Sequence, residues 1–279
     1  MELPDFRQAV FIFTGMNLQQ MPIGIFDSGV GGTSIWKEIN KLLPHENTIY
    51  LADSRHAPYG EKPPAEIVRL SIKNSQELID RGCKIIVVAC NTATTNAIAV
   101  LRATFDLPFI GIEPAIKPAA LNTQTKAVGI LATRGTLSSE LFNRTSDSFA
   151  GDVNVIEIVG SGLVPLIERG ALESKELRAL LEKYMEPMVN ANIDYLVLGC
   201  SHYPYLIPLL KEILPATVTI IDSGAAVARQ TAEVLGRNDL LQKDNTTPRL
   251  QFFSNGSVGT LENLLADYKG YIEIKRGDF

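Results

Sequence analysis

Cysteine is scarce in this chain, with three residues among 279. A small, odd number of cysteines in a chain of this length is not the pattern of a disulfide framework. We therefore expect the protein to lie in the cytoplasm, where thiols stay reduced. No two cysteines are spaced as Cys-x-x-Cys, so the sequence contains no redox motif of that kind.

Basic stretches and long apolar runs are missing as well. The formal net charge is −5 and no segment is strongly basic, so we expect no nucleic-acid partner. No apolar run approaches the roughly 20 residues that span a membrane, so we expect no membrane association. The apolar run at 9–13 is short and follows Glu2 and Asp5, which argues against a secretory signal. What is present, 46% hydrophobic and 20% charged residues, is typical of a globular enzyme.

Short apolar strands alternate with amphipathic helices along most of the chain. Strands are predicted at 22–26, 48–51, 85–88, 109–112, 127–132, 153–158, 195–199, 218–221, 250–253 and 271–274. The intervening helices include 64–81, 94–105, 113–121, 138–149 and 163–169. This alternation predicts an α/β fold with mostly parallel sheets flanked by helices. The length favours two domains, preceded by an extension at 1–21 that follows no periodic pattern.

Two of the predicted strands end in a cysteine. Ile85–Val88 leads to Cys90, and Tyr195–Gly199 leads to Cys200, 110 residues later. The turn Asp-Ser-Gly also occurs twice, at 27–29 and at 222–224. Ligands of open α/β sheets bind beyond the carboxyl ends of the strands. We therefore expect two similar domains whose thiols face each other across one cleft, and we place the active site there.

A buried cysteine is often no more than a small apolar side chain. Cys83, near a predicted helix end without polar neighbours, fits that description. Cys90 and Cys200 differ, because polar residues follow each of them directly: Asn91 and Thr92, Ser201 and His202. No second Cys or His lies at ligand spacing, so we expect no metal site.

Two thiols on opposite sides of a ligand suit one chemistry in particular. One thiolate removes a proton from a carbon atom, and the other thiol returns a proton on the opposite face. Such groups need tuned pKa values. Asp27 and His202, which follow the first strand and Cys200 respectively, are the side chains placed to tune the thiols or to shuttle protons.

The glycine-rich segment at 27–32 invites comparison with nucleotide-binding loops. It fails the dinucleotide pattern at Ser34 and lacks the Gly-Lys-Ser/Thr end of a P-loop. We interpret it as a loop whose amides, with Asp27, meet a small zwitterion. Hydroxyl and amide donors for its carboxylates would come from Asn91, Thr92, Thr133 and Thr136. Arg134 is the one arginine in these motifs, and we expect it to be solvated.

Several of these segments together resemble glutamate racemases, a family of cofactor-independent enzymes with two α/β domains. The segments are 26–32 (Phe-Asp-Ser-Gly-Val-Gly-Gly), 57–60 (Ala-Pro-Tyr-Gly), 89–93 (Ala-Cys-Asn-Thr-Ala), 128–136 and 198–204 (Leu-Gly-Cys-Ser-His-Tyr-Pro). The resemblance runs in order from about Pro22 to Asp222. It implies an α/β domain over 22–114 plus 224–279 and a second over 115–223.

The resemblance also implies roles for individual residues. Cys90 and Cys200 would be the two catalytic acid/base thiols, assisted by Asp27, His202 and Glu168. The substrate would be held by Asp27, Ser28, Tyr59, Gly60, Asn91, Thr92, Thr133, Thr136, Ser201 and His202. Two positions depart from the family: Ser201 stands where Thr is usual, and Gly160-Ser161 stands where many members have Cys-Pro ahead of the glutamate.

The function implied is the interconversion of L- and D-glutamate, without cofactor or metal, to supply D-glutamate for peptidoglycan. A homodimer is expected, and the extension at 1–21 resembles a subgroup activated by the precursor UDP-N-acetylmuramoyl-L-alanine. Two alternatives stay open at this point. One is a related racemase that acts on aspartate; the other is a non-catalytic two-domain sensor that closes on an amino acid.

Overall fold

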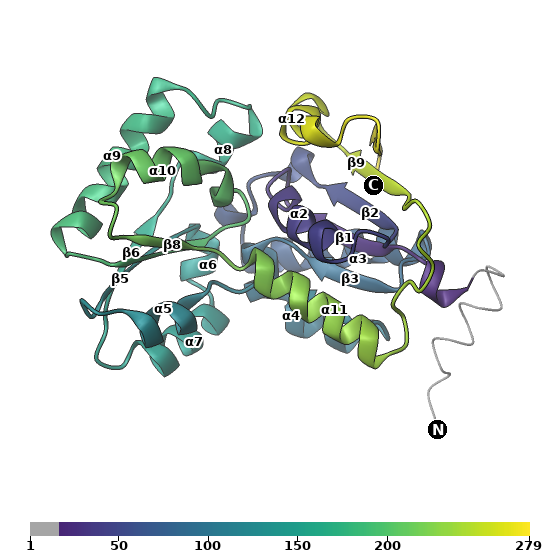
Figure 1. The fold of residues 1–279 in the computed structure, drawn as a ribbon, viewed down its shortest axis with the longest axis horizontal. Coiled ribbons are helices and arrows are strands. Elements are labelled where there is room, and N and C mark those ends of the chain that lie inside the picture. Colours follow the sequence, from purple (N-terminus) through teal and green to yellow (C-terminus); the bar gives the residue numbers. More distant parts are fainter. Residues whose placement is uncertain (1–16) are drawn as a thin grey trace.

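The computed structural model describes residues 17–279, without the side chains of Phe149 and Ala150. Its strands form two parallel sheets, ordered β10-β9-β2-β1-β3-β4 and β6-β5-β7-β8. In Figure 1, β1, β2, β3 and β9 lie on one side of the molecule and β5, β6 and β8 on the other. The strands are β1 (Ile23–Asp27), β2 (Thr48–Ala52), β3 (Ile85–Val88), β4 (Phe109–Gly111), β5 (Ala127–Ala132), β6 (Asn154–Val159), β7 (Tyr195–Gly199), β8 (Thr219–Ile221), β9 (Leu250–Ser254) and β10 (Ile272–Arg276).

Helices cover both faces of each sheet. They are α2 (Thr33–Leu42), α3 (Pro64–Asp80), α4 (Asn91–Thr104), α5 (Ile116–Asn122), α6 (Arg134–Leu137), α7 (Glu140–Ala150), α8 (Leu163–Glu168), α9 (Lys175–Asn190), α10 (Ile207–Ile213), α11 (Gly224–Arg237) and α12 (Gly259–Leu264). Short 3₁₀ helices are η1 (Leu18–Gln20), η2 (Ser54–His56), η3 (Tyr59–Glu61), η4 (Tyr203–Leu206) and η5 (Ala266–Tyr268).

The hydrophobic cores follow from the strand sequences. The central strands are apolar on both faces, as parallel sheets between helices require. In β1, Ile23 and Ile25 pack towards α2, α11 and α12, whereas Phe26 packs towards α3 and α4. The smaller sheet is enclosed in the same way, by α8, α9 and α10 on one face and α5 and α7 on the other. The predicted fold class is therefore confirmed.

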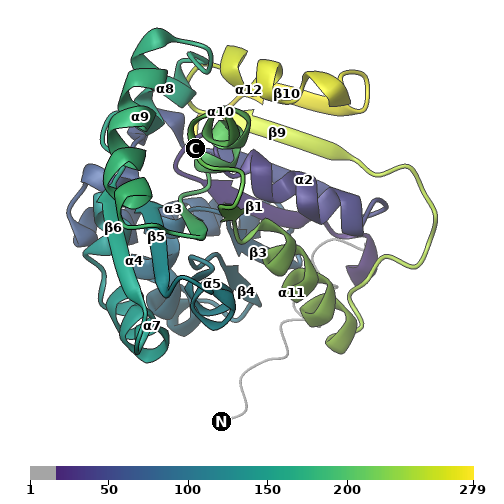
Figure 2. The same ribbon diagram turned by 60° about the vertical axis from the view of Figure 1, so that its left-hand side comes forward.

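The chain passes twice between the two layered units. It leaves the larger sheet after β4 and returns after β8, when α11 packs against α2. The C-terminal strands then complete the larger sheet: β9 pairs with β2, and β10 lies beside β9, as Figure 2 shows. The domain boundaries expected at 114/115 and 223/224 fall within these two passages, and they stay a prediction.

Some element boundaries differ from the sequence prediction. The helix expected from Thr94 begins at Asn91, because the Cys90 sulfur caps it and accepts a hydrogen bond from the Ala93 N–H at 3.4 Å. The helix expected from Glu113 begins at Ile116. Glu113 precedes Pro114, and a residue in that position is disfavoured in the helical conformation. The loop expected at 53–64 contains η2 and η3. Most of the extension, residues 1–16, lies outside the described part of the chain.

Within residues 17–279, no helix has the length and apolar character needed to cross a membrane.

Candidate functional site

The carboxyl ends of the two sheets meet. Asp27 ends β1 and Cys90 follows the adjacent strand β3, while Thr133 and Cys200 follow the adjacent strands β5 and β7. Both thiols line one small cavity of about 10 Å³. The other residues of its lining are Ser28, Pro58, Tyr59, Gly60, Asn91, Thr92, Thr133, Val164, Ser201 and His202. This volume is close to the space of a single water molecule, so the two domains close tightly over the site.

The loop after β1 lacks side chains where the other domain approaches. A Cβ atom on Gly29 would lie 1.9 Å from a carboxylate oxygen of Glu168, and one on Gly31 would lie 2.2 Å from Nδ1 of His202. No real side chain tolerates contacts this short. The glycines at these positions therefore serve close approach of the two domains, and no phosphate needs to be invoked to explain them.

Asp27 fixes the shape of that loop. Its Oδ2 accepts hydrogen bonds from the N–H groups of Gly29 and Gly32 at 3.2 and 3.0 Å. Its Oδ1 accepts one from the Ser201 hydroxyl at 3.1 Å, across the cleft. Burial raises the pKa of the Asp27 carboxyl, while the nearby His202 and the Gly32 N–H act in the opposite direction. Asp27 thus links the two domains directly beside the thiols.

His202 is buried between Cys200 and Glu168. Its Nδ1 lies 3.8 Å from the Cys200 sulfur, and its Nε2 lies 2.5 Å from Oε1 of Glu168. Burial alone would lower the pKa of this imidazole, but Cys200, Glu168 and Asp27 together raise the pKa well above its ordinary value. These contacts favour the protonated form of the ring and place it to exchange a proton with Cys200.

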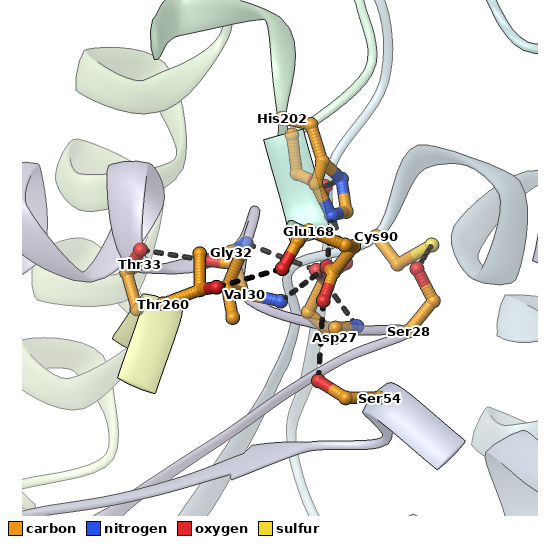
Figure 3. Close-up of polar contacts among 12 residues, drawn as sticks. Asp27, Ser28, Val30, Gly32, Thr33, Ser54, Cys90, Glu168, His202 and Thr260 are labelled. Atoms are coloured by element: carbon orange, nitrogen blue, oxygen red, sulfur yellow. Dashed lines mark hydrogen bonds and ion pairs between the residues drawn. The ribbon is translucent and has the colours of Figure 1, made fainter. Parts of the chain in front are cut away.

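Glu168 joins the ring to the opposite domain. The same Oε1 accepts a hydrogen bond from the Val30 N–H at 2.7 Å, and Oε2 accepts one from the Ser54 hydroxyl at 3.3 Å. The backbone carbonyl of Glu168 accepts a further bond from the Thr260 hydroxyl at 2.7 Å. Figure 3 shows these contacts around Glu168 and Asp27. The departure at Gly160-Ser161 has not displaced the glutamate from His202.

Cys90 has a different environment from Cys200. Its sulfur caps α4, and its thiol donates a hydrogen bond to the Ser28 hydroxyl at 3.7 Å. Burial raises the pKa of the Cys90 thiol, and the negative charge of Asp27 raises it further, against the Ala93 and Ser28 hydrogen bonds. These effects favour the neutral thiol at Cys90, whereas Cys200 has the His202 ring beside it.

Three threonine hydroxyls form a cluster where α4 meets α6. Thr92 and Thr133 are 2.7 Å apart, Thr133 and Thr136 are 3.0 Å apart, and Thr92 and Thr136 are 3.3 Å apart, all between Oγ1 atoms. Next to them the Asn91 side chain is buried, and neither its nitrogen nor its oxygen has a hydrogen-bond partner among the described residues. A buried amide without a partner is costly, so this cluster is suited to bind the carboxylate of a ligand.

Tyr59 and Gly60 form a wall of the cavity. The Tyr59 hydroxyl donates to the Asp53 carboxylate at 2.5 Å and accepts from the Asn74 amide at 3.1 Å. Its polar end is therefore already engaged, and the ring contributes shape. A Cβ on Gly60 would lie 2.7 Å from the Thr133 side chain, so the two domains touch here too.

The structure brings the predicted residues together in two layers. Ten of them line the cavity, whereas Asp27, Thr136 and Glu168 stand behind that lining and contact it. Cys83 is buried in the apolar core beneath α3, as predicted. Arg134 is exposed, as predicted.

Some contributing groups were missed in the sequence. Val164 lines the cavity, and Ser54, Thr260 and the Val30 N–H hold Glu168. Nothing local marks these residues, because their contacts depend on how the domains meet. The second Asp-Ser-Gly turn repeats only the local geometry: Asp222 accepts from the Gly224 N–H at 2.7 Å but does not line the cavity. Among residues 17–279, no three His, Cys, Asp or Glu side chains are grouped to hold a metal ion.

Known proteins match this chain closely. A family model for Asp/Glu/Hydantoin racemases matches residues 23–231. The glutamate racemase of Pseudomonas syringae pv. tomato is 51% identical over 258 residues, which cover 91% of this chain and 94% of the relative. A Bacillus anthracis glutamate racemase structure has a TM-score of 0.83 at 29% identity, covering 94% of this chain and 98% of that one.

A further structure, of Escherichia coli glutamate racemase with L-glutamate and the activator UDP-MurNAc-Ala, has a TM-score of 0.80 at 34% identity. The match covers 92% of this chain and 98% of that one. The fold and the site thus define an amino-acid racemase of the Asp/Glu/hydantoin class. Within that class the chain belongs to the glutamate racemase family, whose members are isomerases.

Proposed function

We propose that this protein interconverts L- and D-glutamate by two-base proton transfer at the α-carbon, with Cys90 and Cys200 as the two bases. The observation that carries the proposal is that both thiols line one small cavity, each from the end of a central strand in a different sheet. Relatives that are 44–51% identical are glutamate racemases, which supports glutamate as the substrate.

The reaction balances with the groups at hand. Cys200, as a thiolate paired with the His202 imidazolium, takes the α-proton of one enantiomer and becomes a thiol. The Cys90 thiol then gives its proton to the opposite face of the carbanion and becomes a thiolate. The C–H bond broken is replaced by a C–H bond of inverted geometry, and the reverse reaction exchanges the two roles. The proposal uses no cofactor and no metal.

The surrounding residues would hold the substrate during this exchange. Ser28 and Ser201 would meet the zwitterionic end, with the Asp27 carboxylate directly behind them, whereas the N–H groups of Gly29, Val30 and Gly32 are already bonded to Asp27 and Glu168. Asn91 and the hydroxyls of Thr92 and Thr133 would bind carboxylate oxygens, with the Thr136 hydroxyl supporting the two threonines from behind. Because the closed cavity is only about 10 Å³, the domains must separate for glutamate to enter.

We place the product in peptidoglycan synthesis, which consumes D-glutamate, and the protein in the cytoplasm as a homodimer. The E. coli relative was crystallised with the activator UDP-MurNAc-Ala. We propose the same class of activator for this chain. The extension resembling an activated subgroup lies mostly outside the described residues, so the proposal for activation rests on the relative.

Isotope exchange tests this function directly. Purified protein is incubated with L-glutamate in heavy water, and optical rotation and α-deuterium are followed together. Appearance of D-glutamate carrying α-deuterium is the expected result. If L-glutamate shows neither a change in optical rotation nor α-deuterium uptake, with and without the muramoyl precursor, the proposal is overturned. Turnover of L-aspartate instead would favour the aspartate alternative, and binding without any exchange would favour the sensor.

A further inference from the structure

A second, larger cavity adjoins the catalytic one. It has a volume of about 370 Å³ and is partly open to solvent. Four residues line both cavities: Pro58 and Gly60 from one domain, and Thr133 and Val164 from the other. The partition between the two spaces is therefore the line along which the domains touch. A ligand that fills the larger cavity lies directly outside the thiols.

The lining of the outer cavity contains two charged residues, Arg134 and Glu61. The rest of the lining is small and uncharged, with Val159, Gly160, Ser161, Gly162 and Pro165 beside the four shared residues. Arg134 is exposed and makes no ion pair with another described residue, in contrast to Arg144 on α7, which pairs with Glu140 at 3.8 Å. Its positive charge is free to act on a ligand.

Arg134 also occupies a connecting position. It follows Thr133 directly, and the Thr133 hydroxyl belongs to the hydroxyl cluster with Thr92 and Thr136. An anion attracted to Arg134 is therefore next to Thr133, the first of the hydroxyl donors that would bind it in the catalytic cavity. Glu61 belongs to η3, on the opposite side of the cleft, and its charge acts against an anion.

We propose that the outer cavity is the entrance vestibule for a small dicarboxylate, and that Arg134 attracts the distal carboxylate and passes it to the threonine cluster. This inference rests on the proposed function, because it assumes an acidic amino acid as substrate. Such a substrate carries a net negative charge, and it approaches a protein of net charge −5 with Asp27 and Glu168 behind the site. A cation at the mouth offsets this repulsion locally.

The magnitude is that of a solvent-exposed charge. Two unit charges about 4 Å apart in water interact by about 1 kcal/mol, which is about fivefold in affinity. The attraction continues after the carboxylate has reached the threonine cluster, so it raises affinity for the substrate and for the transition state alike. It therefore changes KM and leaves kcat as it was.

Four variants test the inference: Arg134→Gln, Arg134→Lys, Glu61→Gln and the control Arg144→Gln. At an ionic strength of roughly 0.02 M, Arg134→Gln is expected to raise KM for both enantiomers about fivefold, with kcat unchanged. Arg134→Lys, which keeps the charge, is expected to stay near the wild-type KM. Glu61→Gln is expected to lower KM, and Arg144→Gln to change neither constant. At roughly 0.5 M salt the differences are expected to shrink below twofold.

Three results would overturn the proposal that the outer cavity is an entrance vestibule. They are an Arg134→Gln effect no larger than that of Arg144→Gln, a loss confined to kcat, or a KM increase that persists at high salt. Failure of the proposed function is recognised separately, since wild-type protein would then show no exchange of the α-proton of glutamate. If the wild type racemises glutamate and the variants behave alike, only the vestibule is wrong.

Discussion

The Glu168 carboxylate lies 2.5 Å from the His202 imidazole and, through the same oxygen, 2.7 Å from the Val30 N–H of the opposite domain. One oxygen atom therefore both polarises the ring beside Cys200 and holds the domains together. Opening of the cleft at this point breaks the contact with Val30, whereas the contact with His202 lies within one domain and is lost only if Glu168 itself moves away. The charge of His202 and the closure of the site are coupled through this side chain.

Glu168→Gln is expected to lower the pKa of His202, because a neutral amide stabilises the imidazolium less than a carboxylate does. Titration of the ring resonances by NMR measures this shift, and His45 and His56 serve as internal controls. We also expect kcat to fall while the alkaline limit of the pH profile moves to lower pH. An unchanged His202 titration would contradict the coupling.

The contact between Glu168 and His202 also leads to a prediction about stability. In the folded protein the pKa of His202 is raised, so its stabilising contribution is complete below the unfolded value of about 6.5. This contribution is lost as the pH rises through the folded pKa. Wild type is therefore expected to exceed Glu168→Gln in unfolding free energy by about 1.5–3 kcal/mol near pH 6, with a smaller difference in alkaline solution. Urea unfolding at the two pH values measures it.

Gly31→Ala is expected to reduce activity strongly while the β1 domain still folds. The added Cβ would lie 2.2 Å from Nδ1 of His202, so the domains can no longer close fully. Loss of alignment at this distance costs on the order of 100-fold in kcat. Gly236→Ala in α11 is the control, because its Cβ meets nothing nearer than 3.5 Å. That variant is expected to keep full activity and to gain about 0.5–1 kcal/mol of stability. Normal activity of Gly31→Ala would show that closure here is not needed.

Much of this site could be predicted from the sequence because its residues follow apolar strands directly. Asp27, Cys90, Thr133 and Cys200 each come at or just after the end of a run whose burial is evident from composition. Parallel pairing then brings such positions to one edge of a sheet. The start of α4 was misplaced because a cysteine cap is not among the usual N-cap residues.

The contacts between domains could not be predicted in that way. Ser54 and Thr260 lie 114 and 92 residues from Glu168 in sequence, and neither belongs to a recognisable motif. Their hydrogen bonds to Glu168 form because the two separately packed domains lie against each other in this relative orientation. The volumes of the two cavities and the position of Arg134 in the lining of the outer one depend on the same contact between the domains.

The three cysteines make a matched set for the proposed chemistry. Cys90→Ser and Cys200→Ser are each expected to lower kcat for racemisation by about 10²- to 10⁴-fold, because a hydroxyl is a far weaker acid than a thiol. Cys83→Ala removes an equally buried sulfur outside the cleft, so it is expected to keep kcat and lose only about 1 kcal/mol of stability. Polarimetry with both enantiomers measures all three. Full racemisation by Cys90→Ser would remove that thiol from the mechanism.

Thr136→Val tests whether the hydroxyl cluster binds the substrate. Valine matches the shape of threonine but leaves the Thr92 and Thr133 hydroxyls without one of their partners. Loss of a buried hydrogen-bonding group costs about 1–3 kcal/mol, so kcat/KM for glutamate is expected to fall about 5- to 150-fold. Thr136→Ser, which restores the hydroxyl, is expected to recover most of the loss. Thr231→Val in α11 is the control, because that equally buried hydroxyl donates to the Val227 carbonyl of its own helix, away from the cleft, and kcat/KM is expected to stay unchanged. Equal losses in Thr136→Val and Thr231→Val would mean that the cluster supports the fold and does not contact glutamate.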